Sequence, residues 1–299
     1  MATVVSPPDE LSDRTRAQPS ASIVIPAHNE ARVIGRCLAS ILDGARPGEL
    51  EIAVVCNGCT DDTAERAGKF APAVRVVETP VASKIHALNL GDKNVTAFPR
   101  FYVDADIELS AAAIREVAAL LDDSSPTVVA APRAKVAYDD RPWGVRAFYR
   151  VWTRLPYFRE NMIGSGVYAF SRKGRARFDV FPDIIADDEF ARLNAGPSER
   201  RVGTTNVFTI HPPRTLSGVV KINVRARAGS RELDLRFPEL KRHDNTNPGR
   251  TLRELLVMPS LWPSAPVYIG VMLLASKRAK DKLRKRQEKV WERDDSSRT

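Results

Sequence analysis

The sequence predicts an α/β protein with a mostly parallel central sheet flanked by helices. Between residues 21 and 110, short apolar runs alternate four times with helical patterns, which is typical of strand–helix–strand units and a parallel sheet. The 299 residues are 43% apolar and 28% charged, close to the usual composition of globular proteins, so the chain can bury a core.

The first two predicted strands are short and apolar. The first spans residues 22–26 and ends at a proline, and apolar residues then recur at helical spacing as far as Leu42. The second spans residues 51–56. We expect Thr60 to cap the next helix, which runs through Ala67.

The later elements follow the same pattern at first. We expect strands at residues 74–78 and 100–103, with a helix at 84–91 between them. Beyond residue 110 we expect helices at 111–121 and 186–193, strands at 127–131 and 167–170, and a basic, then helical segment past residue 219.

Polar residues follow three of the predicted strands. They are His28 to Glu30, Asn57 with Gly58, and Asp104 to Asp106. Ligands of parallel sheets bind at the carboxyl ends of the strands, so these residues are expected to lie near a ligand.

Two acidic clusters are candidates for chemistry. Asp104 and Asp106 are separated by one residue, and a hard cation such as Mg²⁺ or Mn²⁺ would relieve their mutual repulsion. The alternative is a solvated acidic turn. Asp188 lies in an acidic run at a helix start, where it would act as a general base or only complement the helix dipole.

Two cations could contact phosphate. Lys84 begins a predicted helix, and Arg225 lies in the segment RARAG, where guanidinium groups could hold a leaving diphosphate. The alternatives are an ordinary surface lysine and a solvated basic loop.

Together these segments resemble family 2 glycosyltransferases, which have the GT-A fold and invert the anomeric centre. The similar segments are IVIPAHNE, VVCNGCTDDT, SKIHALNLG, YVDADIELS, GSGVYAFSR, ADDEFARL and RARAG. The resemblance extends from about Ser22 to Gly229. It implies a Mg²⁺ or Mn²⁺ ion and a nucleotide-diphosphate sugar as donor, with a UDP-sugar expected ahead of a GDP-sugar.

The resemblance also implies roles for individual residues. Asp188 would be the catalytic base, and Asp104 and Asp106 would bind the metal. The residues expected to bind the donor are Pro26, Ala27, Asn29, Glu30, Asn57, Lys84, Asp104, Ala105, Asp106 and Arg225.

The sequence departs from the family pattern at four positions. Cys56 and Asn57 replace two acids of the second segment, which leaves the identity of the base open. Ile222 and Ala226 stand where a processive synthase motif has Gln and Trp. Their presence favours a non-processive enzyme that adds one sugar per encounter, in polysaccharide, glycolipid or cell-envelope glycan synthesis.

We divide the chain into three parts. Residues 1–20 are expected to be a flexible leader. Residues 21–240 form the catalytic domain, with a nucleotide-binding half at about 21–110 and an acceptor half at about 111–240. Residues 241–299 form a helical basic extension, which either packs on the domain or lies on an anionic membrane surface.

Charge and cysteine content restrict the partners. The net charge is +9, but the basic residues gather between Lys277 and Lys289, which argues against nucleic acid as a partner. The expected acceptor is a glycan or a lipid-linked acceptor.

Three cysteines without a framework spacing favour free thiols, although Cys56 and Cys59 could also mean redox or zinc chemistry.

We expect a cytoplasmic protein, or one peripheral on the inner face of the membrane, because neither a signal peptide nor a spanning segment is visible. Two other functions remain open. One is a sugar-nucleotide nucleotidyltransferase, although the first loop lacks the glycine-rich sequence that such an enzyme needs. The other is a non-catalytic, nucleotide-sugar-binding or membrane-surface adaptor with the same fold.

Overall fold

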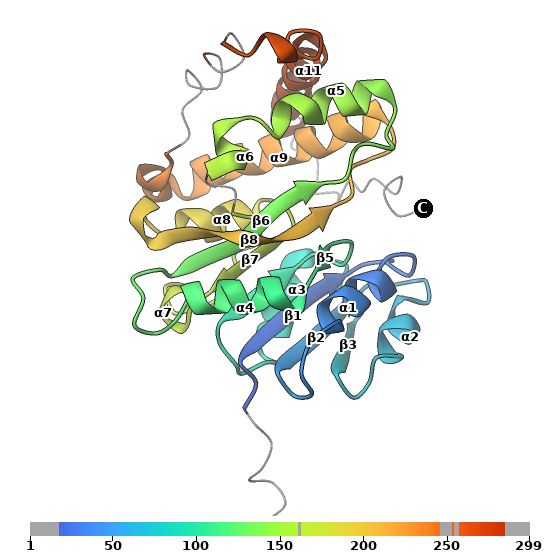
Figure 1. Cartoon of the computed structure of the whole chain (residues 1–299), viewed down its shortest axis with the longest axis vertical. Coiled ribbons are helices and arrows are strands. Elements are labelled where there is room, and N and C mark those ends of the chain that lie inside the picture. Colours follow the sequence, from blue (N-terminus) through green and yellow to red (C-terminus); the bar gives the residue numbers. More distant parts are fainter. Residues whose placement is uncertain (1–17, 161–162, 246–252, 254–256, 285–299) are drawn as a thin grey trace, which may run out of the picture.

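The computed structural model describes residues 18–160, 163–245, 253 and 257–284, and it contains one eight-stranded sheet with helices on both faces (Figure 1). The strand order across the sheet is β3 (Val74–Thr79), β2 (Leu50–Asn57), β1 (Ala21–Ala27), β4 (Arg100–Val103), β7 (Val167–Phe170), β6 (Val129–Val136), β8 (Arg200–Ile210) and β5 (Glu108–Leu109).

Strand direction divides the sheet into a parallel part and a mixed part. β3, β2, β1 and β4 are all parallel. β7 runs antiparallel to both β4 and β6, β8 is parallel to β6, and β5 is antiparallel to β8. The predicted α/β class with a mostly parallel sheet is therefore confirmed.

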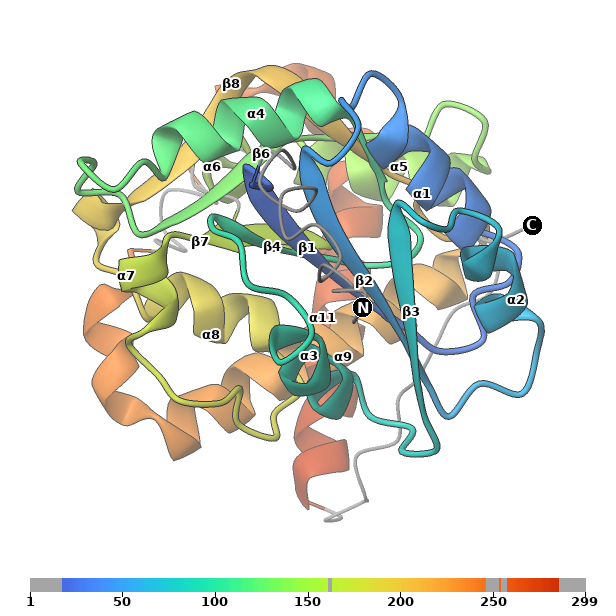
Figure 2. The ribbon, with the colours of Figure 1, turned by 90° about the horizontal axis from the view of Figure 1, so that it is seen from below.

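Both faces of the parallel part are buried, which explains why its strands are continuous apolar runs. On β1, Ile23 and Ile25 belong to one core cluster and Val24 to another. The helices on the first face are α1 (Ile34–Leu42), α2 (Thr63–Gly68) and α4 (Ala111–Leu120). Those on the second face are α3 (Lys84–Asp92), α7 (Arg172–Arg175) and α8 (Asp187–Leu193), as Figure 2 shows.

A third core cluster lies mainly between three helices and includes Val136 at the end of β6. The three helices are α5 (Trp143–Trp152), α9 (Leu216–Arg236) and α11 (Ala265–Arg284), at the top of Figure 1. The short helices are α6 (Pro156–Glu160), η1 (Pro197–Glu199), η2 (Pro238–His243) and η3 (Pro259–Leu261). In α11, Tyr268, Val271 and Ala275 are buried in this cluster, so the C-terminal helix packs on α5 and α9.

The other face of α11 is exposed. Trp262 just before it and Ile269 and Leu273 within it are 58%, 45% and 67% exposed. Within the described part of the chain, no helix combines the length and apolar character needed to cross a bilayer. The predicted leader lies outside the described residues except for 18–20, and so does the basic tail beyond residue 284.

The sequence predictions differ from the structure at several elements, among them α5 and β5, which were not predicted. Thr60 does not cap α2, which begins at Thr63; Asp61 instead accepts the amide of Thr63 at 3.1 Å. β6 extends five residues beyond the predicted end at residue 131. β8 was missed because most of its side chains are polar or exposed, and pairing with β6 rather than an apolar pattern defines it.

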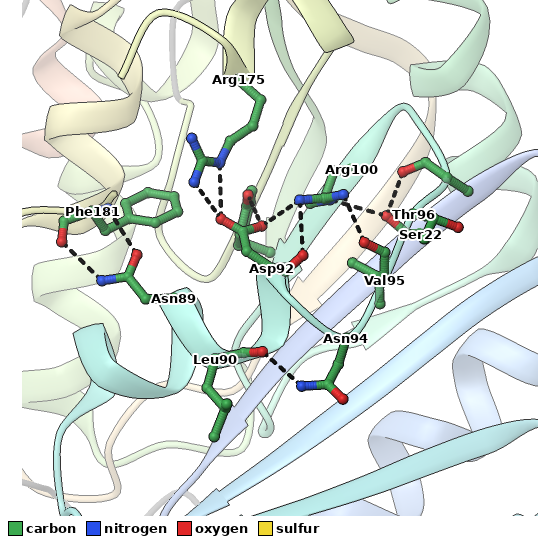
Figure 3. A network of polar contacts seen from close by, with 12 residues as sticks. Ser22, Asn89, Leu90, Asp92, Asn94, Val95, Thr96, Arg100, Arg175 and Phe181 are labelled. Carbon is green, nitrogen blue, oxygen red and sulfur yellow. Dashed lines mark hydrogen bonds and ion pairs between the residues drawn. The ribbon is translucent and has the colours of Figure 1, made fainter. Parts of the chain in front are cut away.

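The placement of α3 depends on a buried carboxylate at its last residue, Asp92 (Figure 3). Asp92 Oδ1 lies 2.8 Å from Arg100 Nη1 and accepts the hydroxyl of Tyr102 at 2.6 Å. Asp92 Oδ2 accepts two bonds from Arg175, at 2.8 and 2.6 Å. One carboxylate therefore ties α3 to β4 and to α7.

Two further contacts fix α3 against its neighbours. A Cβ at Gly91 would lie 2.2 Å from Val24 Cγ1, so only glycine allows the helix to approach β1 this closely. Asn89 makes two hydrogen bonds with the backbone of Phe181, at 3.0 and 2.8 Å, which links α3 to the loop before α8.

We predict that Asp92→Asn lowers the free energy of unfolding by about 3–5 kcal/mol, because two arginines would be left in the core without a carboxylate. The measurement is urea unfolding followed by circular dichroism. Asp62→Asn is the control: it breaks the exposed ion pair with Arg66 and should change the midpoint little. Equal midpoints for Asp92→Asn and wild type would contradict the role of Asp92.

Candidate functional site

The ends of four strands meet at one edge of the sheet. The carboxyl ends of β1, β2 and β4 lie there because these strands are parallel. β7 is antiparallel, so the residues before it arrive at the same edge, and the amide of Asp104 donates to the carbonyl of Gly166 at 2.8 Å. The sequence could not show this approach, because strand direction is a property of the whole sheet.

A cavity of about 1000 Å³ opens at this edge of the sheet and extends to α9, which forms part of its wall. Eight of the residues predicted for the site line it: Pro26, Glu30, Lys84, Asp104, Ala105, Asp106, Asp188 and Arg225. The other three, Ala27, Asn29 and Asn57, lie just outside its lining.

Lys84 lies at the centre of the charged groups. It is the first residue of α3, whose N-cap Ser83 accepts the amide of His86 at 3.2 Å. Its Nζ is 2.8 Å from Asp104 Oδ1 and 3.1 Å from Asp187 Oδ1. Burial alone would lower the pKa of Lys84, but the two carboxylates outweigh it and raise the pKa, so Lys84 remains protonated.

Asp187 was not singled out from the sequence. Its side chain is only 4% exposed and accepts the hydroxyl of Tyr168 at 3.0 Å, in addition to the ion pair with Lys84. Burial raises the pKa of Asp187, although Lys84 opposes this shift. The acidic run at the start of α8 was the available signal, but neither charge nor spacing shows which acid points into the core.

Asp188 is held by a left-handed turn before β7. Its Oδ2 accepts the amide of Ser165 at 3.0 Å, and its Oδ1 accepts the amide of Glu189 at 2.8 Å. Gly164 and Ser165 have φ angles of 113° and 56°, and a Cβ at Gly164 would lie 2.7 Å from Asp188 Oδ2. The conformation of the turn and the position of this carboxylate therefore depend on each other.

Asp104 and Asp106 have the chemistry of a divalent-cation site. Both carboxylates are half-buried and face the cavity directly after β4, with hard oxygen donors suited to Mg²⁺ or Mn²⁺. No set of three or more metal-ligating side chains exists in the portion of the chain that the structure describes. An ion here would draw its remaining ligands from water or from phosphate oxygens, as Mg²⁺ commonly does.

The residues outside the cavity lining support the loop after β1. Asn57 is fully buried and donates to the carbonyl of Ala27 at 2.9 Å. Asn29, with a φ of 51°, accepts the amide of Thr60 at 2.7 Å. Their predicted contacts with a nucleotide stay a prediction.

One of the three cysteines, Cys59, also contacts this loop. The thiol of Cys59 donates to the carbonyl of Ala27 at 3.4 Å, and its sulfur accepts the amide of Asn29 at 3.4 Å. Cys37 and Cys56 are buried, and all three cysteines are free thiols. The hydrogen bond from Cys56 lowers the pKa of Cys59. Cys59 thus supports the loop as a free thiol.

Several cavity residues were missed in the sequence. Tyr149 and Trp152 of α5, Arg192 of α8, and Arg227 and Arg231 of α9 all line it. The segment RARAG includes Arg227, but only Arg225 was given an individual role, and Arg231 lies beyond that segment. The aromatic stretch of α5 is visible in the sequence, but only the packing of α5 against α9 places it beside the site.

The protein-family model for glycosyl transferase family 2 matches residues 22–183, more than half of the chain. The chain belongs to this family. It is therefore a glycosyltransferase. A search of curated proteins found no match to the sequence.

Solved structures agree with the fold of this glycosyltransferase. The mannosyltransferase PcManGT from Pyrobaculum calidifontis, in complex with GDP-Man and Mn²⁺, is 21% identical; the match covers 90% of this chain and 79% of that one, with a TM-score of 0.58. Glucosyl-3-phosphoglycerate synthase from Mycobacterium tuberculosis, with Mg²⁺ and UDP, is 22% identical over 72% and 78%, with a TM-score of 0.52. TarS 1–349 from S. aureus is 14% identical over 91% and 93%, with a TM-score of 0.50. At these identities the likeness concerns the fold, which is of the GT-A type.

Proposed function

We propose that this glycosyltransferase moves a sugar from a nucleotide-diphosphate sugar to an acceptor hydroxyl, with inversion and with the help of a divalent cation. The observation that carries the proposal is the gathering of Asp104, Asp106 and Asp188 around one cavity at the carboxyl edge of the parallel strands. The transferred sugar would lie between the two aspartates after β4 and the carboxylate at the start of α8.

At the donor end, Asp104 and Asp106 would hold Mg²⁺ or Mn²⁺ together with the diphosphate. When bound, the cation supplies positive charge that stabilises the leaving diphosphate. Lys84 keeps Asp104 in place and adds a positive charge beside it. The proposed nucleotide-binding residues are Pro26, Ala27, Asn29, Glu30 and Asn57. The two solved relatives hold GDP-Man and UDP respectively, so both UDP- and GDP-sugars remain candidate donors.

At the acceptor end, Asp188 would take the proton from the attacking hydroxyl. The two backbone amides that bind its carboxylate fix the direction in which it faces. The acceptor oxygen would form its bond to the anomeric carbon as the bond to the diphosphate breaks on the opposite side, which inverts that centre. Arg225, on the cavity wall, would stabilise the departing diphosphate.

We infer that the enzyme adds one sugar per encounter. Ile222 and Ala226 line the cavity at the positions where the processive motif has Gln and Trp, so the groups that hold a growing chain in that motif are replaced by small or apolar side chains. We also propose that residues 21–240 form the catalytic domain, with its donor half ending near residue 110.

We predict that Asp188→Asn lowers kcat by about 10²- to 10⁴-fold, the usual contribution of a general base, and leaves donor affinity nearly unchanged. Transfer would be followed by release of the nucleoside diphosphate in the presence of acceptor, and donor affinity by calorimetry. Asp179→Asn, an exposed acid outside the cavity, serves as the control. Undiminished transfer by Asp188→Asn would rule out this base.

We predict that UDP or GDP raises the Tm of the protein with Mn²⁺ but not with a chelator, and that Asp106→Ala removes the difference. A nucleotide at 100 times its Kd should add about 2.7 kcal/mol of stability. Asp123→Ala, an exposed acid distant from the cavity lining, should behave as wild type. Equal stabilisation of Asp106→Ala with metal and with chelator would exclude Asp106 as a ligand.

We also propose that the exposed face of α11 lies on an anionic membrane surface. The exposed apolar side chains are Trp262, just before the helix, and Ile269 and Leu273 within it. They are followed along the helix by the exposed cations Lys277, Arg278 and Lys280. An apolar face next to a basic one is typical of interfacial helices. This surface would bring the enzyme to a lipid-linked acceptor on the cytoplasmic side.

We predict that the full chain cosediments with vesicles of phosphatidylglycerol and phosphatidylcholine, and less so as salt rises or as phosphatidylglycerol is omitted. The double substitution Ile269→Ser and Leu273→Ser should reduce binding about tenfold or more, because two apolar side chains would no longer enter the interface. Leu235→Ser alters an equally exposed leucine of α9 and should have no effect. If the double variant bound vesicles as well as wild type does, the proposed membrane surface on α11 would be wrong.

A further inference from the structure

α9 brings three arginines into the cavity: Arg225, Arg227 and Arg231. Among the residues that the structure describes, none of the three lies within ion-pair distance of a carboxylate. Arg231 donates only to Ser276, to its carbonyl at 3.2 Å and its hydroxyl at 3.1 Å. The Nε of Arg227 is buried and has no hydrogen-bond partner within the described residues.

Three other arginines that are largely buried do have carboxylates. Arg100 and Arg175 share Asp92, and Arg192 lies 3.2 Å from Asp244. Burial of a guanidinium group without a counter-charge is costly, and burial does lower the pKa of Arg227. The arginines of α9 thus carry a positive charge that the described side chains leave unbalanced.

Arg227 and Arg231 belong to the side of α9 that faces α11. Arg231 reaches Ser276 of α11, and Tyr268 of the same helix interacts electrostatically with Arg227. Between these two arginines, Gly229 and Ser230 face α8 instead. A Cβ at Gly229 would lie 2.9 Å from the Cβ of Ala186, and the hydroxyl of Ser230 donates to Glu189 at 2.5 Å.

Asp188 belongs to α8, whose first residues contact both the turn before β7 and α9. On the sheet side its carboxylate accepts the amide of Ser165, which belongs to the turn that also contacts Asp104 through Gly166. On the other side, the neighbouring residues Ala186 and Glu189 contact α9. Asp104, Asp188 and the Arg227–Arg231 pair thus come from three different elements that line the same cavity.

We propose that Arg227 and Arg231 form an anion subsite for the acceptor, and that this acceptor carries a phosphate group. The inference rests on the proposed function, because the acceptor hydroxyl must reach Asp188. Arginine pairs bind phosphate through several charge-assisted hydrogen bonds, which the guanidinium groups of Arg227 and Arg231 on the cavity wall would supply. The phosphate would supply the negative charge that the protein itself lacks at α9.

The test uses the full chain saturated with Mg²⁺ and whichever of UDP or GDP raises its Tm, so that the donor phosphate position is filled. Glycerol 3-phosphate should raise the Tm further, and glycerol should not. Arg227→Gln should weaken glycerol 3-phosphate binding about tenfold or more, the loss expected for one charge-assisted hydrogen bond, without changing nucleotide affinity. Arg227→Lys should retain part of the binding.

Lys221→Gln is the matched control, because Lys221 is an exposed cation of the same helix outside the cavity lining. Dihexanoyl phosphatidic acid, compared with dihexanoyl phosphatidylcholine, distinguishes the source of the phosphate. Tighter binding of phosphatidic acid than of glycerol 3-phosphate supports a lipid phosphate, and equal binding supports a soluble one.

Two results would overturn the subsite: no response to either phosphate while nucleotide still binds, or loss of nucleotide affinity in Arg227→Gln. A failure of the donor proposal looks different. In that case no nucleotide would raise the Tm, while glycerol 3-phosphate added alone would still bind and would still depend on Arg227.

Discussion

The ion pairs of Lys84 connect the two halves of the site. Its ammonium group bridges Asp104, which follows a strand of the parallel sheet, and Asp187, which begins α8. Three charges close together in a partly buried cavity are stable only if their positions are fixed, since removing one partner leaves the others uncompensated. Asp92 supplies this rigidity at the other end of α3 by binding Arg100 and Arg175.

Two neighbouring acids of α8, Asp187 and Asp188, have different surroundings in this arrangement. Asp187 points into the core, where Lys84 and Tyr168 compensate its charge. Asp188, the next residue, lines the cavity and accepts hydrogen bonds from two backbone amides. Backbone amides orient a carboxylate without placing a full positive charge beside it, which would suit the proposed role of Asp188 as general base. The left-handed turn at Gly164 and Ser165 supplies one of these amides.

The helical layer of α5, α9 and α11 gives the cavity a second wall of different chemistry. The edge of the sheet presents carboxylates, whereas α9 presents arginines and α5 presents aromatic rings. The same helix α11 that packs against α9 exposes an apolar and basic face to the outside. One helix, α11, would therefore contact both the proposed acceptor-binding arginines of α9 and the proposed membrane surface.

The sequence by itself determined the parallel half of the fold and the family. Buried parallel strands are continuous apolar runs, and the polar residues that follow them must share one edge, so Asp104 and Asp106 could be placed in advance. β8 could not be predicted, because strand pairing rather than side-chain pattern defines it. Only the tertiary structure decided that β7 runs antiparallel, that Asp187 rather than Asp188 pairs with Lys84, and that Arg227 and Arg231 face the cavity. These features depend on contacts between segments far apart in the chain, which local periodicity does not record.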